Sequence, residues 1–129
     1  MNSGKSLSRH LLSNGLTLEI WDRSRPVAGD RWLVVLEGTV KVPVNDTTLP
    51  LELKPRAAEV IAALGPQLVY SQKDERNFIA AQDVAGLLAE MAARLLELAD
   101  GYLGHPEFPG RLIRKKFAAC QQQPRWSAS

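Results

Sequence analysis

The sequence has a single cysteine, Cys120, among 129 residues, so no disulfide can form within the chain. A fold without disulfides does not depend on an oxidising compartment. Apolar runs are short, and none approaches the roughly 18 consecutive residues that span a bilayer. The first six residues lack the apolar core of a signal peptide. We therefore expect a small cytoplasmic protein of bacterial type that makes no use of a membrane.

Catalytic and metal-binding motifs are also missing. His10 and His105 do not have the spacing typical of metal ligands, and no Gly-x-Ser-x-Gly element occurs. Cys120 shares a helical line with Ile113 and Phe117, which favours a buried, unreactive thiol over a nucleophile. We therefore expect no metal, no cofactor and no catalytic residue. An enzyme whose catalytic residues lie far apart in the sequence is the weakest alternative.

The composition is that of an ordinary globular protein. Apolar residues make up 45% of the chain and charged residues 23%. A chain of this length buries enough apolar surface for one domain with its own core. We expect a flexible N-terminus at residues 1–6, a single domain at 7–123 and a C-terminal tail at 124–129.

The N-terminal half has the pattern of an antiparallel sheet. Asn14-Gly15 predicts a tight hairpin turn, and apolar residues alternate with polar ones from Leu16 to Ile20. Six apolar residues occupy even positions between Trp32 and Val44, which predicts the longest strand of the sheet. We place two further short strands at residues 49–53 and 67–72, and a polar loop at 22–31.

The C-terminal half is mainly helical in pattern. Pro55 predicts the start of a helix that Gly65 ends. Between Asp83 and Leu103, two adjacent apolar seams repeat every three or four residues, and a last helix is predicted at about 109–122. Together these elements indicate an α+β fold. We expect an antiparallel sheet of four to five strands in the N-terminal half, with about three helices packed on one face.

Two groups of basic residues are candidates for binding an anion or a nucleic acid. One lies in the 22–31 loop, where arginines could hold a phosphate or carboxylate; the alternative is a solvated loop whose charges pair locally. The other lies in residues 105–129, which carry a net charge of +4 against −3 for residues 73–104. There, basic side chains could follow phosphates while a tryptophan stacks on a base. The candidates are Arg23, Arg25 and Arg31 for an anion, and Arg111, Arg114, Lys115 and Trp126 for nucleic acid.

The long predicted helix has more apolar surface than one sheet face can cover. Its second seam contains Leu96, Ala99 and Leu103, which we expect to contact a second copy of the chain. The alternative is a helix buried entirely within a monomer. We therefore expect a binding or protein-interaction module, a homodimer, rather than an enzyme. The second hypothesis is a nucleic-acid or anionic-ligand binder that uses the basic residues above.

Overall fold

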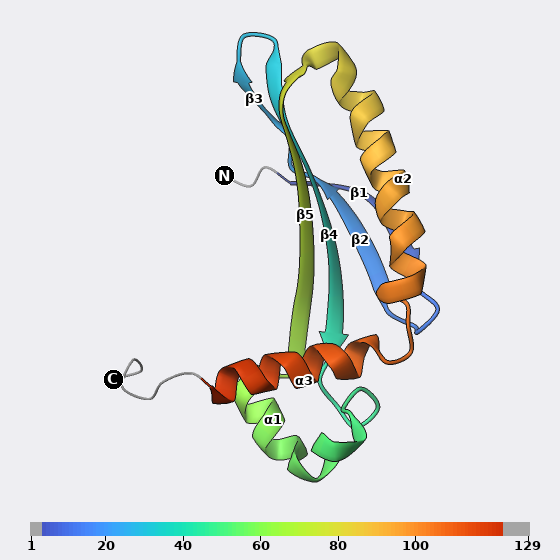
Figure 1. The fold of residues 1–129 in the computed structure, drawn as a ribbon, viewed down its shortest axis with the longest axis vertical. Helices are drawn as coiled ribbons and strands as arrows, with labels where there is room; N and C mark the ends of the chain where they lie inside the picture. The colour runs from blue at the N-terminus through green and yellow to red at the C-terminus, as the bar shows by residue number, and fades with distance from the viewer. Residues whose placement is uncertain (1–3, 123–129) are drawn as a thin grey trace, which may run out of the picture. The chain divides into compact units, whose positions relative to one another are not determined.

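The structure, a computed structural model, describes residues 4–122 and confirms the predicted α+β class (Figure 1). Five strands form one antiparallel sheet, with three α-helices and two short 3₁₀ helices. The strands are β1 Lys5–Leu11, β2 Thr17–Asp22, β3 Arg25–Ala28, β4 Arg31–Pro43 and β5 Gln67–Ala80. The helices are η1 Leu51–Arg56, α1 Ala57–Leu64, η2 Ala81–Asp83, α2 Val84–Tyr102 and α3 Phe108–Gln121.

The chain divides into two compact units. Among the described residues, the sheet unit comprises residues 4–40 and 70–105, and the helical unit comprises residues 41–69 and 106–122. β1 begins at Lys5, within the segment predicted to be flexible, whereas the predicted tail at 124–129 lies outside the described residues.

β4 is the central strand of the sheet unit. β2 pairs with its middle, where Leu18 lies opposite Val40, and β3 pairs with its beginning, where Arg25 lies opposite Leu33. β5 also pairs with β4. The predicted loop at 22–31 is therefore wrong in part, because residues 25–28 form β3. Ser24 bridges the break between β2 and β3, since its hydroxyl accepts a hydrogen bond from the Val35 amide at 3.0 Å.

The predicted hairpin at Asn14-Gly15 is confirmed. The Gly15 amide donates to the Leu12 carbonyl at 3.0 Å, and Gly15 has φ +89°, a conformation that glycine adopts at low cost. Asn14 serves a different purpose, because its side-chain amide donates to the carbonyls of Leu103 and His105 at 2.8 and 2.9 Å. These bonds fasten the β1–β2 turn to the end of α2.

Two strand predictions were wrong. β5, with 14 residues, is longer than β4, with 13, because the strand continues through the polar residues 73–77. Residues 49–53 form no strand, because residues 51–53 are the first turn of η1. Leu49 and Leu53 are buried while Leu51 is 81% exposed, so this segment buries residues four apart, as a helical turn does.

The core of the helical unit lies between α1, α3 and the segment that precedes α1 in the chain. It consists of Val44, Leu49, Leu53, Val60, Ile113 and Phe117. The predicted burial of Ile113 and Phe117 is confirmed, but that of Cys120 was wrong, because Cys120 is exposed. The reason is that every residue from Ala118 to Gln122 is exposed, so the core ends one turn before the helix does.

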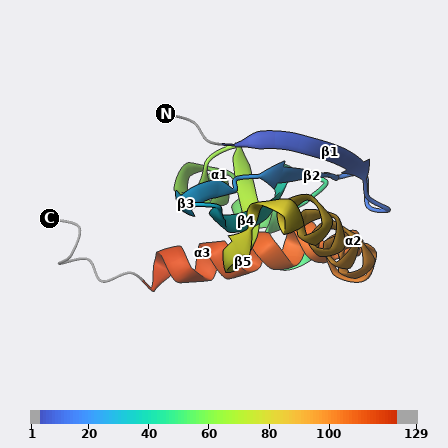
Figure 2. The same ribbon diagram turned by 90° about the horizontal axis from the view of Figure 1, so that it is seen from above.

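In the sheet unit, α2 lies along one face of the sheet (Figure 2). Its buried side chains are Leu88, Met91, Leu95 and Ala99, and Leu103, directly after the helix, is buried too. The helix approaches the sheet closely at Gly38 of β4, where a Cβ atom would lie 2.8 Å from Leu95 Cδ2 and 3.2 Å from Leu18 Cδ1. The absence of a side chain at Gly38 therefore makes room for α2.

Candidate functional site

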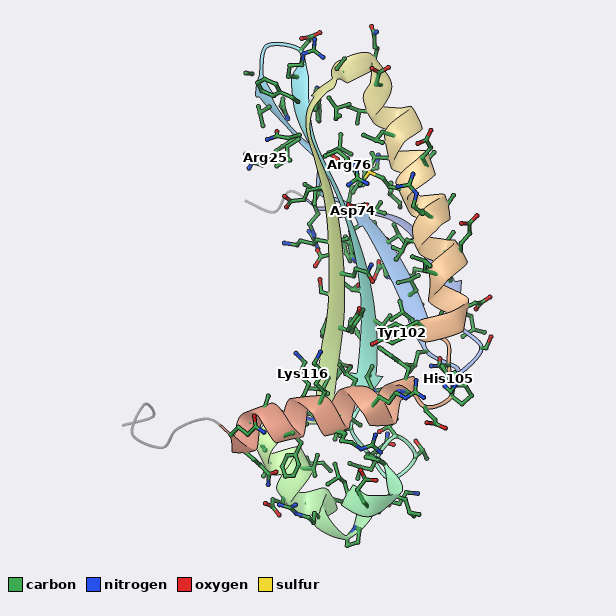
Figure 3. All side chains as sticks on the ribbon, in the orientation of Figure 1. Arg25, Asp74, Arg76, Tyr102, His105 and Lys116 are labelled. Carbon is green, nitrogen blue, oxygen red and sulfur yellow. The ribbon has the colours of Figure 1, made fainter. Side chains whose placement is uncertain are left out.

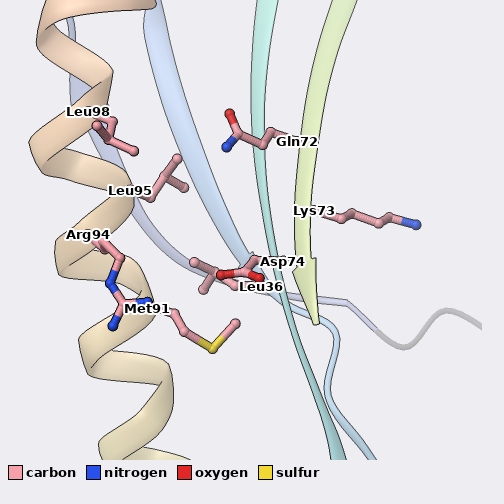
Figure 4. A pocket seen from close by; sticks show the side chains of 8 residues that line it. All are labelled: Leu36, Gln72, Lys73, Asp74, Met91, Arg94, Leu95 and Leu98. Atoms are coloured by element: carbon pink, nitrogen blue, oxygen red, sulfur yellow. The ribbon is translucent and has the colours of Figure 1, made fainter. Parts of the chain in front are cut away.

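A groove runs between β5 and α2 in the sheet unit. It consists of two adjoining hollows of about 180 Å³ and about 260 Å³, which share Gln72, Leu95 and Leu98. Figure 4 shows the first of them. Successive side chains of a strand point to opposite faces, so alternate residues of β5 line the strand side of the groove. Tyr70, Gln72 and Asp74 lie on the strand side, and Leu36, Met91 and Leu95 contribute buried or nearly buried apolar surface.

The helix side of the groove exposes large apolar side chains. Leu98 is 64% exposed and Tyr102 is 55% exposed, although both follow buried residues of α2 by three positions. Burial raises the pKa of the Tyr70 hydroxyl, and the nearby Tyr102 hydroxyl raises it further. The two hydroxyl groups therefore lie close enough to interact electrostatically. The groove thus combines apolar side chains with hydroxyl and amide groups, and with the charged residues Lys73, Asp74 and Arg94 at one end.

The opposite face of the sheet carries a buried carboxylate that the sequence analysis did not single out. Glu37 is only 9% exposed, and its two carboxylate oxygens accept hydrogen bonds from Arg23 Nε and Ser71 Oγ. The Arg23 guanidinium also lies 4.9 Å from the centre of the Trp21 ring. The available signal was a lone charge inside the apolar run from Val34 to Val40, since a buried charge requires a partner.

Glu37 makes stability depend on pH. Burial raises the pKa of its carboxyl, but the hydrogen bonds from Ser71 and Arg23 outweigh burial, so the pKa lies below its usual 4.5. A carboxyl with a lowered folded-state pKa stabilises the fold above its unfolded pKa, and this contribution is lost as the pH falls through the folded-state value.

We expect Glu37→Gln to flatten the acid limb of the stability profile. The free energy of unfolding, measured by denaturant titration between about pH 6 and pH 3, should fall less steeply with acid in the variant than in the unmodified chain. The other carboxylates with a lowered pKa, Glu52 and Glu59, are present in both proteins and cancel in the comparison. Parallel profiles would contradict the role assigned to Glu37.

The three arginines predicted to bind an anion have separate surroundings. Arg23 binds Glu37, whereas Arg31 Nε lies 3.7 Å from Asp30 Oδ1. Arg25 is exposed at the start of β3 (Figure 3). Anion binding by these residues stays a prediction. The pairing of Arg31 with Asp30 agrees with the alternative of a loop whose charges pair locally, whereas Arg23 pairs with a residue outside the loop.

Two of the basic residues proposed for nucleic acid also have carboxylate partners. Arg111 Nη2 lies 3.3 Å from Glu107 Oε1, and Arg114 Nε donates to Glu52 Oε2 at 2.5 Å. The hydrogen bond from Arg114 lowers the pKa of Glu52. Lys115 is exposed on α3. Trp126 lies outside the described residues, so nucleic-acid binding by this group stays a prediction.

The residues predicted for the interface differ in burial. Ala99 and Leu103 are each 2% exposed within one chain, and Leu96 is half-buried. Ala99 and Leu103 are therefore covered by the chain's own packing. The apolar surface that α2 leaves uncovered consists of Leu98 and Tyr102, which the sequence pattern assigned to the other seam.

Comparison with protein-family models, with curated proteins and with solved structures found no match to this chain. Among residues 4–122, no three histidine, cysteine, aspartate or glutamate side chains gather in a way that could hold a metal ion. No helix in that range is both long enough and apolar enough to cross a bilayer.

Proposed function

We propose that this chain is a protein-interaction module that forms a homodimer through the groove between β5 and α2. The observation that carries the proposal is the exposure of Leu98 and Tyr102 beside an apolar groove. Adjoining exposed apolar side chains on a folded surface are typical of binding sites. Closed twofold pairing is the commonest way in which a chain covers such a surface.

The edge of the sheet formed by β5 is a less suitable surface for contact with a second copy of the chain. In the described sheet β5 pairs only with β4, so its other edge is open. Four consecutive charged residues, 73–76, occupy the middle of this strand, and Asp74 pairs with Arg76 at 2.5 Å. Charged residues on an edge strand disfavour the addition of another strand. We therefore favour contact through the face that carries the groove.

Replacing Leu98 by glutamate tests the proposal. Each dimer contains this position twice, so the variant would bury two carboxylates and lose two apolar contacts. We expect the association constant to fall at least about 100-fold, since burying one leucine contributes about 2 kcal/mol and each 1.4 kcal/mol is tenfold. Sedimentation equilibrium at micromolar concentration should give twice the 14.2 kDa chain mass for the unmodified protein and the single mass for Leu98→Glu.

Leu51→Glu is the matched control. Leu51 is 81% exposed and lines neither hollow of the groove, so this variant should keep the dimer mass. A single-chain mass for the unmodified protein across the micromolar range would refute the proposal. Equal weakening by both variants would show that the groove is not the contact.

A further inference from the structure

We infer that the second copy docks with its α2 antiparallel to the first, with the twofold axis beside Leu98. Each Arg94 would then lie against the partner's Tyr102. This inference rests on the proposed homodimer and adds the register of the two helices, that is, which residues of one α2 lie opposite which residues of the other. It begins from three residues, Arg94, Leu98 and Tyr102, which all line the groove and are all exposed, the Arg94 side chain at 56%.

The three residues form one row along α2 because they are spaced by four. Leu98 lies at the centre, with Arg94 about 6 Å toward one end of the helix and Tyr102 about 6 Å toward the other. A twofold axis that reverses the helix direction at Leu98 therefore brings Leu98 beside its own copy and each Arg94 beside the partner's Tyr102. An arginine over a tyrosine ring is a favourable pair.

The alternative parallel arrangement would set like charges against each other. Arg94 would face the partner's Arg94 in that arrangement. In the antiparallel arrangement each Arg94 lies opposite the partner's uncharged Tyr102 instead, so the two guanidinium groups are separated. The charge pattern of the row therefore favours one direction of the second helix.

The row also defines how the two helices cross. Rows of residues spaced by four are inclined to the helix axis, and when two such rows lie side by side the axes cross at about 50°, the commonest helix packing in globular proteins. In this geometry the two Leu98 side chains meet at the twofold axis, and the second α2 lies over the helix side of the groove. Each copy would therefore cover the groove of its partner.

Cysteine cross-linking tests the register. All variants carry Cys120→Ser, because the exposed native thiol would itself cross-link. A disulfide requires Cα atoms about 4.4–6.8 Å apart, a condition that only residues directly opposite each other meet. Under mild oxidation, Leu98→Cys should give a covalent dimer. Arg94→Cys and Tyr102→Cys should each remain uncross-linked alone but should cross-link when mixed.

The mixed pair keeps Leu98, so the test holds even if Leu98→Cys weakens association. A dimer mass in sedimentation without a 94–102 cross-link would overturn the register and leave the proposed homodimer intact. Cross-linking of Arg94→Cys with itself as efficient as that of the mixture would also overturn it, in favour of a parallel pair. A single-chain mass for the Cys120→Ser protein would overturn both the register and the homodimer.

Discussion

Replacing Phe117 by alanine is expected to lower the free energy of unfolding by about 3–5 kcal/mol, the range for removing a large buried aromatic side chain. Phe117 is 3% exposed and packs in the core of the helical unit with Val60 and Ile113. Its ring also lies 5.0 Å from the Arg56 guanidinium carbon, a contact that the substitution removes. Denaturant titration followed by helical circular dichroism should show this loss.

Cys120→Ala is the matched control for Phe117→Ala. Cys120 lies one turn further along α3, is exposed, and has no place in the core. Alanine is also a good helix former, so the control should change the free energy of unfolding by no more than about 0.5 kcal/mol. A loss below about 1 kcal/mol for Phe117→Ala would show that this core does not stabilise the helical unit.

The elements with a strong local pattern could be predicted from the sequence. Strict alternation in residues 16–20, the turn glycine at Gly15 and the long apolar periodicity of α2 each depend on neighbours a few residues apart. The end of α1 at Gly65, with φ +85°, is of the same kind. For these elements the conformation that the local sequence favours is the one found in the fold. The α+β class could therefore be predicted from them.

Other elements depend on distant partners. The polar stretch 73–77 has no apolar alternation, and it forms part of β5 because β4 offers a pairing edge and the polar side chains can remain in solvent. Cys120 continues the apolar line of Ile113, but within residues 4–122 the last turn of α3 is exposed. Periodicity gives the direction of a side chain and does not give the extent of the core that covers it.

The groove could not be predicted because it depends on the rotation of α2 over the sheet. Two adjacent apolar seams allowed two rotations, and the pattern gave no reason to choose between them. The close approach at Gly38 places Leu95 against the sheet, and Ala99 and Leu103 follow it into the interior. Leu98 and Tyr102 are left beside β5, a strand some 30 residues earlier in the chain.

Leu95 and Leu98, three positions apart on α2, are expected to respond differently to substitution by alanine. Leu95 is 8% exposed and packs against Gly38 and Leu18, so Leu95→Ala should lower the free energy of unfolding by about 2–4 kcal/mol. Leu98 is 64% exposed, so Leu98→Ala should leave the stability of the single chain almost unchanged. Alanine preserves the helix in both variants.

Protein concentration separates the two effects. A dimer adds stability that grows with concentration, because association draws the equilibrium toward the folded chain. We expect the melting temperature of the unmodified protein and of Leu95→Ala to rise with concentration, with Leu95→Ala lower throughout. The melting temperature of Leu98→Ala should equal that of the unmodified protein in dilute solution and should be lower than it at high protein concentration. A Leu98→Ala melting temperature equal to that of the unmodified protein at every concentration would mean that this leucine contacts no second chain.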